Sequence, residues 1–140
     1  MKRATFALSI VLSLLSCNED ETQVSCGGEV IFLEENSAII SDPYQIISAR
    51  IDETCLEIVV SAGGCDGQSW QGKLFVFPEE SLSSQPKKQV EFSLEDKELC
   101  EALVQRTFSF DLSGISGSVD VIINLTGWSE ALSLQARTSE

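Results

Sequence analysis

The stretch Val119-Asp-Val-Ile-Ile-Asn-Leu125 carries the clearest structural pattern in the chain. Every second position from Val119 to Leu125 is apolar, which is the two-residue period of a strand that buries one face. Gly117 precedes the stretch and Gly127 follows it, and glycines commonly bound strands. The pattern therefore predicts a β-strand that ends near Leu125.

Similar runs of apolar, β-branched and aromatic residues occur along the rest of the chain, with turn residues between them. A series of about seven or eight such strands predicts an all-β fold. We expect a single antiparallel β-sandwich, immunoglobulin-like in general form. The other runs are Glu29–Leu33, Tyr44–Ile51, Cys55–Val60, Lys73–Phe77, Gln89–Leu94, Thr107–Leu112 and Ala131–Ala136.

Three local features refine this expectation. The short polar break Asp52-Glu53 predicts a hairpin between the second and third runs. Residues 61–72 are rich in glycine and are expected to form a loop. Leu99, Leu103 and Val104 have helical spacing, so one short helix is expected near residues 95–105.

The N-terminal residues have the features of an export signal. Lys2 and Arg3 are basic, and Ala4 to Leu15 is uncharged and mostly apolar. That core is shorter than the roughly twenty apolar residues needed to span a bilayer, and its length is typical of a signal peptide. We therefore expect residues 1–16 to be a signal peptide.

The end of this signal, Leu14-Leu15-Ser16-Cys17, resembles the lipobox of bacterial lipoproteins. In that class the cysteine thiol receives a diacylglyceryl group, the peptide is cut before the cysteine, and the new amino group is usually acylated. The resemblance implies lipidation at Cys17 and attachment to a membrane through acyl chains, because two or three chains anchor stably. The alternative is an ordinary signal peptide that happens to end in Ser-Cys.

Residues 17–25 then form a lipidated acidic tether, and residues 26–140 form the β-sandwich domain. The run Asn18-Glu-Asp-Glu21 resembles the surface-export signal of lipoproteins in Bacteroidota, although a solvated acidic tether explains it equally well. Asn18 also differs from the aspartate that retains enterobacterial lipoproteins in the inner membrane. We expect the protein at the outer membrane, on its periplasmic face or on the cell surface.

The charge of the chain restricts its partners. The whole chain has a formal net charge of −13. Removing residues 1–16 takes Lys2 and Arg3 from the 9 basic residues and leaves the 22 acidic residues, so the mature charge is 7 − 22 = −15. Nucleic-acid binding needs a basic surface and is excluded. A basic protein partner, or simply solubility, fits this charge better.

The number of cysteines supports the lipid assignment independently. The chain has 5 cysteines, so modification of Cys17 leaves four. In an oxidising compartment an even number indicates two disulfides. Four cysteines allow three connectivities, and we favour Cys26–Cys55 with Cys65–Cys100. A zinc site is the alternative, but the chain has no histidine and no CxxC spacing.

Four segments are similar to the C-terminal β-sandwich of NigD-like lipoproteins of Bacteroidota. The shared order is a strand, a Gly-Gly-Cys loop, a second cysteine before Glu-Ala, and a Phe-Asp-Leu-Ser strand end. The resemblance implies a Cys65–Cys100 bridge and supplies no activity. The segments are Leu56–Cys65, Leu99–Val104, Phe108–Ser113 and Val121–Leu125.

No catalytic motif stands out, and we expect no cofactor and no bound metal. The absence of histidine excludes Ser-His-Asp and Cys-His catalysis. Adjacent acids such as Glu34-Glu35 and Glu79-Glu80 lie in turn-like stretches and are interpreted as solvated surface. The Gly-rich loop contains two candidate binding residues. Asp66 is the place to look for calcium, and Trp70 is either a binding anchor or a core residue.

The function expected from these observations is a lipid-anchored envelope lipoprotein that is not an enzyme. Its sandwich would act as a binding or structural module with a protein or glycan ligand. The alternative is an accessory subunit or inhibitor of an envelope or secreted enzyme. A carboxylate-dependent hydrolase ranks last.

Overall fold

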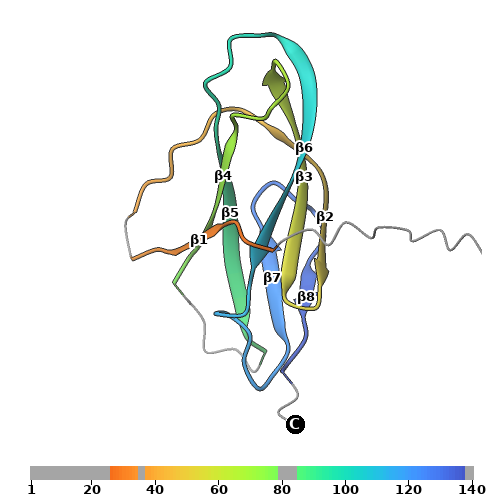
Figure 1. Cartoon of the computed structure of the whole chain (residues 1–140). Helices are drawn as coiled ribbons and strands as arrows, with labels where there is room; N and C mark the ends of the chain where they lie inside the picture. The colour runs from red at the N-terminus through yellow and green to blue at the C-terminus, as the bar shows by residue number, and fades with distance from the viewer. Residues whose placement is uncertain (1–25, 35–36, 79–84, 138–140) are drawn as a thin grey trace, which may run out of the picture.

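The computed structural model describes residues 26–34, 37–78 and 85–137, which form two β-sheets packed face to face (Figure 1). The expected all-β sandwich is confirmed. The predicted signal peptide, Cys17 and the tether lie outside the described residues. The strands are β1 (Glu29–Phe32), β2 (Gln45–Asp52), β3 (Cys55–Gly64), β4 (Gln71–Val76), β5 (Lys87–Glu95), β6 (Ala102–Asp111), β7 (Val121–Leu125) and β8 (Leu132–Leu134).

One sheet has three antiparallel strands in the order β2-β3-β6. The predicted hairpin is confirmed, since β2 pairs with β3 and Glu53 takes a positive φ of 54° in the tight connection. The ladder between β3 and β6 runs without interruption from the Cys55–Asp111 pair to the Gly64–Ala102 pair. The pairing of β2 with β3 shifts register between Ile46 and Ser48.

The other sheet has five strands in the order β1-β4-β5-β7-β8. Two of its pairings, β1 with β4 and β5 with β7, are parallel, so the expectation of a purely antiparallel sandwich is wrong for this sheet. The cause lies in the connections. The chain leaves β5, crosses to the other sheet as β6, and returns to run beside β5 in the same direction. Alternation of apolar residues indicates which face of a strand is buried, but it does not indicate the direction of the neighbouring strand.

The core lies between the two sheets and is filled by alternate residues of the strands. The Phe92 ring lies near its centre, with ring centroids 5.1 Å from Tyr44, 5.1 Å from Phe108 and 5.9 Å from Phe110. The largest fully buried side chains are Phe92, Phe110, Leu56, Ile58, Leu74, Leu94, Leu112, Ile123, Leu134, Val60, Val76 and Val90.

The expected short helix near residues 95–105 is absent. β5 continues to Glu95, the next residues form an irregular segment, and β6 begins at Ala102. Leu99 and Leu103, which carried the helical spacing, are 97% and 80% exposed. No helix forms here because Cys100 is bonded to Cys65 and the residues after it pair with the end of β3. This pairing gives their backbone N–H and C=O groups partners in a sheet.

Other strand boundaries also differ from the prediction, since β4 and β5 each start two residues early and β6 starts five residues early. The strand predicted from Val119 starts two residues later, since Val119 is 53% exposed and β7 begins at Val121. β3 runs on to Gly64, so the Gly-rich loop is shorter than residues 61–72. The expected last edge strand is confirmed as β8. Within the described ranges, no helix is long and apolar enough to cross a membrane.

Candidate functional site

Two disulfides fix the ends of β3, and their connectivity is the one favoured from the sequence. Cys26 is bonded to Cys55 across 29 residues, with a Cα–Cα distance of 5.7 Å. Cys65 is bonded to Cys100 across 35 residues, with a Cα–Cα distance of 4.8 Å. The first bond joins the chain before β1 to the start of β3. The second joins the loop after β3 to the segment before β6.

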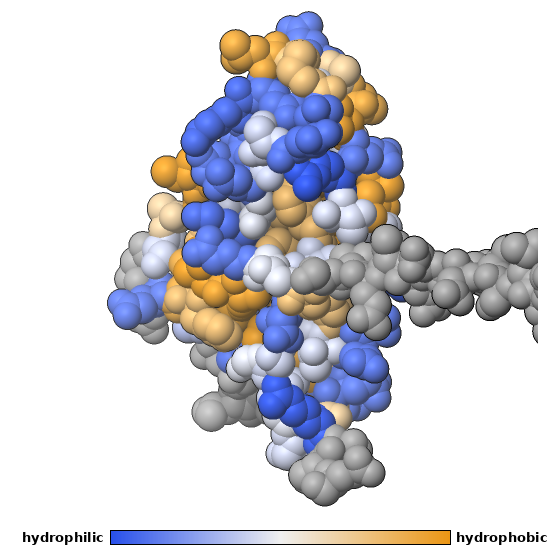
Figure 2. Space-filling model, in the orientation of Figure 1, coloured by the Kyte–Doolittle hydropathy of each residue, from blue (hydrophilic) through white to orange (hydrophobic). Residues whose placement is uncertain are grey.

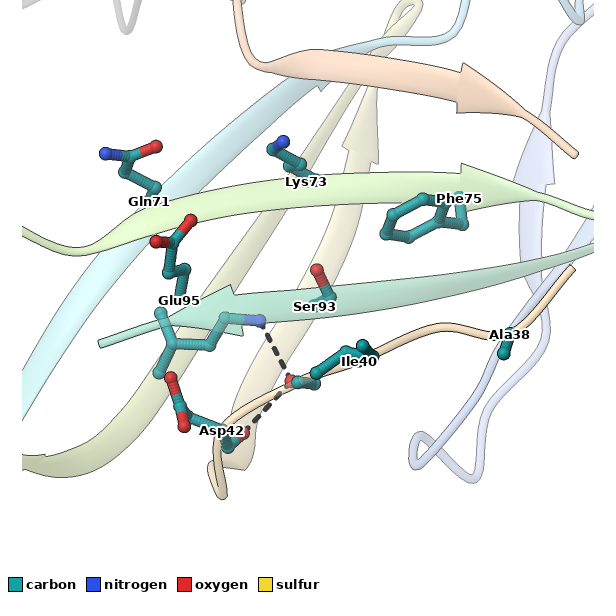
Figure 3. Close-up of a pocket in the computed structure, with 10 residues that line it drawn as sticks. Ala38, Ile40, Asp42, Gln71, Lys73, Phe75, Ser93 and Glu95 are labelled. Atoms are coloured by element: carbon teal, nitrogen blue, oxygen red, sulfur yellow. Dashed lines mark hydrogen bonds between the residues drawn. The ribbon is translucent and has the colours of Figure 1, made fainter. Parts of the chain in front are cut away.

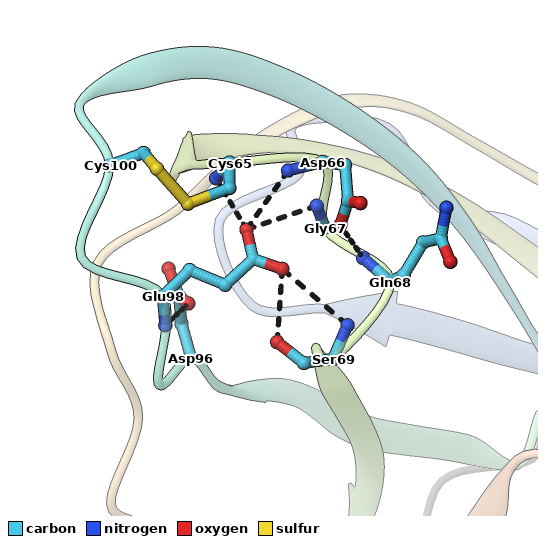
Figure 4. Close-up of a disulfide and its surroundings, with 8 residues drawn as sticks. All are labelled: Cys65, Asp66, Gly67, Gln68, Ser69, Asp96, Glu98 and Cys100. Atoms are coloured by element: carbon cyan, nitrogen blue, oxygen red, sulfur yellow. Dashed lines mark hydrogen bonds between the residues drawn. A yellow bond between two sulfur atoms is a disulfide. The ribbon is translucent and has the colours of Figure 1, made fainter.

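Beside the second disulfide, the loop after β3 wraps around the carboxylate of Glu98 (Figure 4). One carboxylate oxygen accepts hydrogen bonds from the backbone N–H groups of Cys65 at 2.5 Å, Gly67 at 3.1 Å and Asp66 at 3.2 Å. The other oxygen accepts one from the Ser69 hydroxyl at 2.9 Å. Successive N–H groups that converge in this way form an anion-binding nest.

The nest determines the ionisation of Glu98. Desolvation acts to raise the pKa of this carboxyl group, but the hydrogen bonds from Gly67, Cys65, Ser69 and Asp66 outweigh it and lower the pKa to about 2. Hydrogen bonds that favour the charged form have this effect on any carboxylate. The chain therefore fills its own anion site, and the loop is a structural clamp that offers no vacant place for an external anion.

The two residues singled out in this loop have structural roles. The side chain of Trp70 is only 4% exposed and belongs to the core, so it is not an exposed binding anchor. Asp66 is exposed, and its Oδ1 accepts a hydrogen bond from the backbone N–H of Gln68 at 2.9 Å. This bond closes a local turn around the loop glycine. The described residues contain no group of three or more histidine, cysteine, aspartate or glutamate side chains that could hold a metal ion.

Close packing around this loop explains two of its glycines. A Cβ on Gly64 would lie 2.7 Å from Oε2 of Glu98 and 2.8 Å from the Trp70 ring. Gly67 has a φ of +70° and also lies against the Arg106 side chain. The Arg106 guanidinium donates a hydrogen bond to the Gly67 carbonyl oxygen and lies 5.5 Å from the centroid of the Phe108 ring.

A groove of about 320 Å³ lies on the outer face of the five-stranded sheet (Figure 3). Its floor is formed by side chains of β4 and β5 that point away from the core, and its wall is the extended segment that precedes β2. Apolar side chains lie towards one end and polar or charged side chains towards the other. The lining residues are Ala38, Ile40, Ser41, Asp42, Gln71, Lys73, Phe75, Ser93, Leu94 and Glu95.

The wall of the groove is held against the edge of β5 by hydrogen bonds. The Asp42 N–H donates to the Leu94 carbonyl oxygen at 2.8 Å, and the Leu94 N–H donates to Oγ of Ser41 at 3.0 Å. The Tyr44 hydroxyl donates to the Phe92 carbonyl oxygen at 2.5 Å. Residues 41–44 thus occupy the part of the β5 edge that β7 leaves open, since β7 pairs only with residues 87–90.

The charged groups that line the groove have partners of opposite charge or hydrogen-bond donors. Nζ of Lys73 lies 3.5 Å from Oε2 of Glu29, and Oε1 of Glu95 lies 2.6 Å from Nζ of Lys97. The hydrogen bond from Lys97 and its positive charge lower the pKa of Glu95. The Asp42 carboxylate accepts a hydrogen bond from the Asp96 N–H at 2.7 Å. The groove is therefore polar at one end without a strong net charge.

Three carboxyl groups of the described residues, those of Glu95, Glu98 and Asp111, have a lowered pKa. The Ser113 hydroxyl and backbone N–H are the main causes for Asp111. A carboxylate hydrolase needs one acid with a raised pKa. Glu79 and Glu80 lie outside the described residues.

Comparison with known proteins adds no identification, because no protein-family model, curated protein or solved structure matches the chain. The candidate site therefore depends on geometry. Sequence reasoning missed Glu98, because the residues around it were assigned to a helix. A signal was present, since Glu98 stands two residues before Cys100, and pairing of Cys100 with Cys65 brings it to a loop rich in N–H groups.

Proposed function

We propose that the chain is a lipid-anchored lipoprotein of the bacterial envelope whose β-sandwich binds a ligand without catalysing a reaction. Cys17 carries the acyl chains, and residues 17–25 connect them to the sandwich. Pairing of the other four cysteines supports export, because disulfides persist in oxidising compartments. The mature charge of −15 disfavours electrostatic attachment to anionic lipid, so the acyl chains provide the attachment.

The observation that carries the binding role is the groove on β4 and β5. Its volume of about 320 Å³ falls within the range of small-ligand sites, about 300–1,000 Å³. The Phe75 ring and Ile40 offer apolar contact at one end, while Gln71 and Lys73 offer hydrogen-bond donors at the other. This combination suits an amphipathic ligand, such as a glycan segment or a short stretch of another envelope protein.

Site-specific photo-cross-linking in intact cells tests this role. A photoreactive amino acid replaces Gln71 at the polar end of the groove, and a matched control replaces Ser48 on β2 in the other sheet. We expect an adduct from position 71 that disappears when Phe75→Ala is added, and no such adduct from position 48. Equal labelling from the two positions, or an adduct unaffected by Phe75→Ala, would contradict the groove assignment.

The same experiment addresses the alternative role. If the adduct at position 71 contains an envelope or secreted enzyme whose activity changes on binding, the chain is an accessory subunit or inhibitor. If the adduct contains a glycan or a non-enzymatic envelope protein, the simple binding module stands.

A further inference from the structure

The free edge of β6 differs from the other edges of the two sheets. Exposed edges pair readily with other chains, and proteins usually protect them by short strands, bulges or charged side chains. β1 and β8 are short, with 4 and 3 residues. β2 contains a register shift and carries Arg50 and Asp52. β6 has 10 residues paired with β3 without a break, so it lacks the first two protections.

A single contact shows which backbone groups of β6 face outward. The Gly28 N–H donates to the Ser109 carbonyl oxygen at 2.8 Å from outside the sheet. Backbone groups two residues apart point to the same side of a regular strand. The N–H and C=O groups of Leu103, Gln105 and Thr107 therefore point away from β3. In the part of the chain that the structure describes, no backbone partner occupies these groups.

The side chains of this edge also carry no charge that would prevent pairing with another strand. Leu103, Gln105 and Thr107 are exposed and uncharged, in a chain with a net charge of −13. The nearest cation on the strand, Arg106, is held by the carbonyl oxygen of Gly67. Figure 2 shows hydrophobic surface at the upper end of the molecule, where the segment before β6 and the start of β6 lie. The disulfide and the Glu98 clamp fix this end in place.

We infer that the free edge of β6 pairs with β6 of a second copy of the chain. Gly28 covers the strand at Ser109, so the part that no other described residue pairs with runs from Ala102 to Phe108 and has Gln105 at its centre. A two-fold axis through Gln105 makes an antiparallel pair in which the outward backbone groups meet in hydrogen-bonded positions. The two three-stranded sheets then become one continuous sheet.

Self-pairing is favoured over a foreign strand because the open edge is complementary to itself. Across the axis, Leu103 faces Thr107 and Gln105 faces Gln105, so no like charges are directly opposed. On the other face Val104 lies opposite Arg106, which again avoids a clash of charges. The contact is small, so the dimer is weak in solution. The inference depends neither on the groove nor on the lipid anchor, and each can fail independently of the other.

Cysteine cross-linking of the whole chain tests the pairing. In a hydrogen-bonded antiparallel pair the opposed Cα atoms lie about 5.5 Å apart, which a disulfide can bridge. Gln105→Cys should therefore form a covalent dimer under mild oxidation. In Thr107→Cys the two thiols are offset by about 13 Å along the strands and should not react. Ser48→Cys on β2 is a second control. The chain without an introduced cysteine shows how much covalent dimer forms through Cys17.

We expect at least about ten times more dimer from Gln105→Cys than from Thr107→Cys. A mixture of Leu103→Cys and Thr107→Cys chains should also cross-link, because these positions face each other across the axis. Equal yields from positions 105, 107 and 48 would overturn the proposal. A cross-link from position 105 to a different protein, with no covalent dimer, would also overturn it.

Sedimentation of the whole chain in detergent gives an independent readout. Both copies are acidic, so the dimer fraction should rise between about 0.05 M and about 0.5 M NaCl as repulsion is screened. Gln105→Lys places two ammonium groups opposite each other and should abolish the dimer, while circular dichroism confirms that the variant is folded. A chain that stays monomeric at high salt and at concentrations of order 100 μM would contradict the pairing.

Discussion

Gly63 and Gly64 are neighbours in sequence, but only Gly64 is closely packed. A Cβ at Gly63 would meet nothing within 4 Å, whereas at Gly64 it would approach Glu98 and Trp70 within 3 Å. The Gly-Gly pair could be recognised from the sequence as a special backbone position. The need for glycine at position 64 could not be recognised from the sequence. It arises from the side chains of Trp70 and Glu98, which are six and 34 residues further along the chain.

Gly64→Ala should destabilise the fold by about 1–3 kcal/mol, because either Glu98 or the Trp70 ring must move. Gly63→Ala is the matched control and should change stability by no more than about 0.5 kcal/mol. Chemical denaturation of the two variants measures the difference. Similar losses in both would show that the crowding around Gly64 has no energetic consequence.

The Glu98 clamp also makes a prediction about pH. Because the folded pKa of Glu98 is about 2 and the ordinary value is 4.5, the clamp contributes stability above pH 4.5 and loses it as the pH falls towards 2. Glu98→Gln should lower the denaturation midpoint at pH 7 and flatten the stability profile between pH 4.5 and pH 2. The exposed Glu101→Gln is the control. Parallel pH profiles for Glu98→Gln and the unmodified chain would refute the clamp.

At the scale of strands, alternation predicted the elements well and their limits less well. β1 and β2 lie within one residue of their predicted runs at each end, whereas β3 extends four residues further and β7 starts two residues later. The direction of β1 and β7 relative to their neighbours was not predictable, because it depends on the path of the chain between sheets. The helix was predicted wrongly because Leu99 and Leu103 have the spacing of apolar residues on the buried face of a helix, but both are exposed.

Two substitutions in and before β7 test whether the strand and its buried face begin at Val121. Ile123 is fully buried, so Ile123→Ala should cost about 2–5 kcal/mol through lost contacts and a cavity. Val119 continues the same alternation but is 53% exposed, and Val119→Ala should stay within about 0.5 kcal/mol. Thermal or denaturant unfolding compares them. A loss at Val119 as large as that at Ile123 would place Val119 in the core and contradict the observed strand limits.

For the molecule as a whole, the sequence predicted the sandwich and the favoured disulfide pairing, and both are observed. It did not predict the groove, because the wall and floor come from segments 29 to 57 residues apart that meet only in the folded chain. Trp70 was a candidate for a binding site because it is large and lies among glycines, but it fills the end of the core.

The proposed anchor predicts a change of location. Cys17→Ala removes the acyl acceptor, so the protein should lose incorporated palmitate and move from the membrane fraction to the soluble fraction. Asn18→Gln leaves the cysteine in place and should remain in the membrane fraction. Recovery of an acylated Cys17→Ala chain from membranes would show that the lipid is attached elsewhere.

Mass spectrometry of the protein purified from its own cells, without reduction, tests lipidation and disulfide pairing together. We predict a polypeptide that begins at Cys17, carries acyl chains on that residue and has no thiol open to alkylation. Its peptides should be linked as Cys26–Cys55 and Cys65–Cys100. A chain that retains residues 1–16 with an unmodified Cys17, or that shows two or more free thiols while folded, would contradict this prediction.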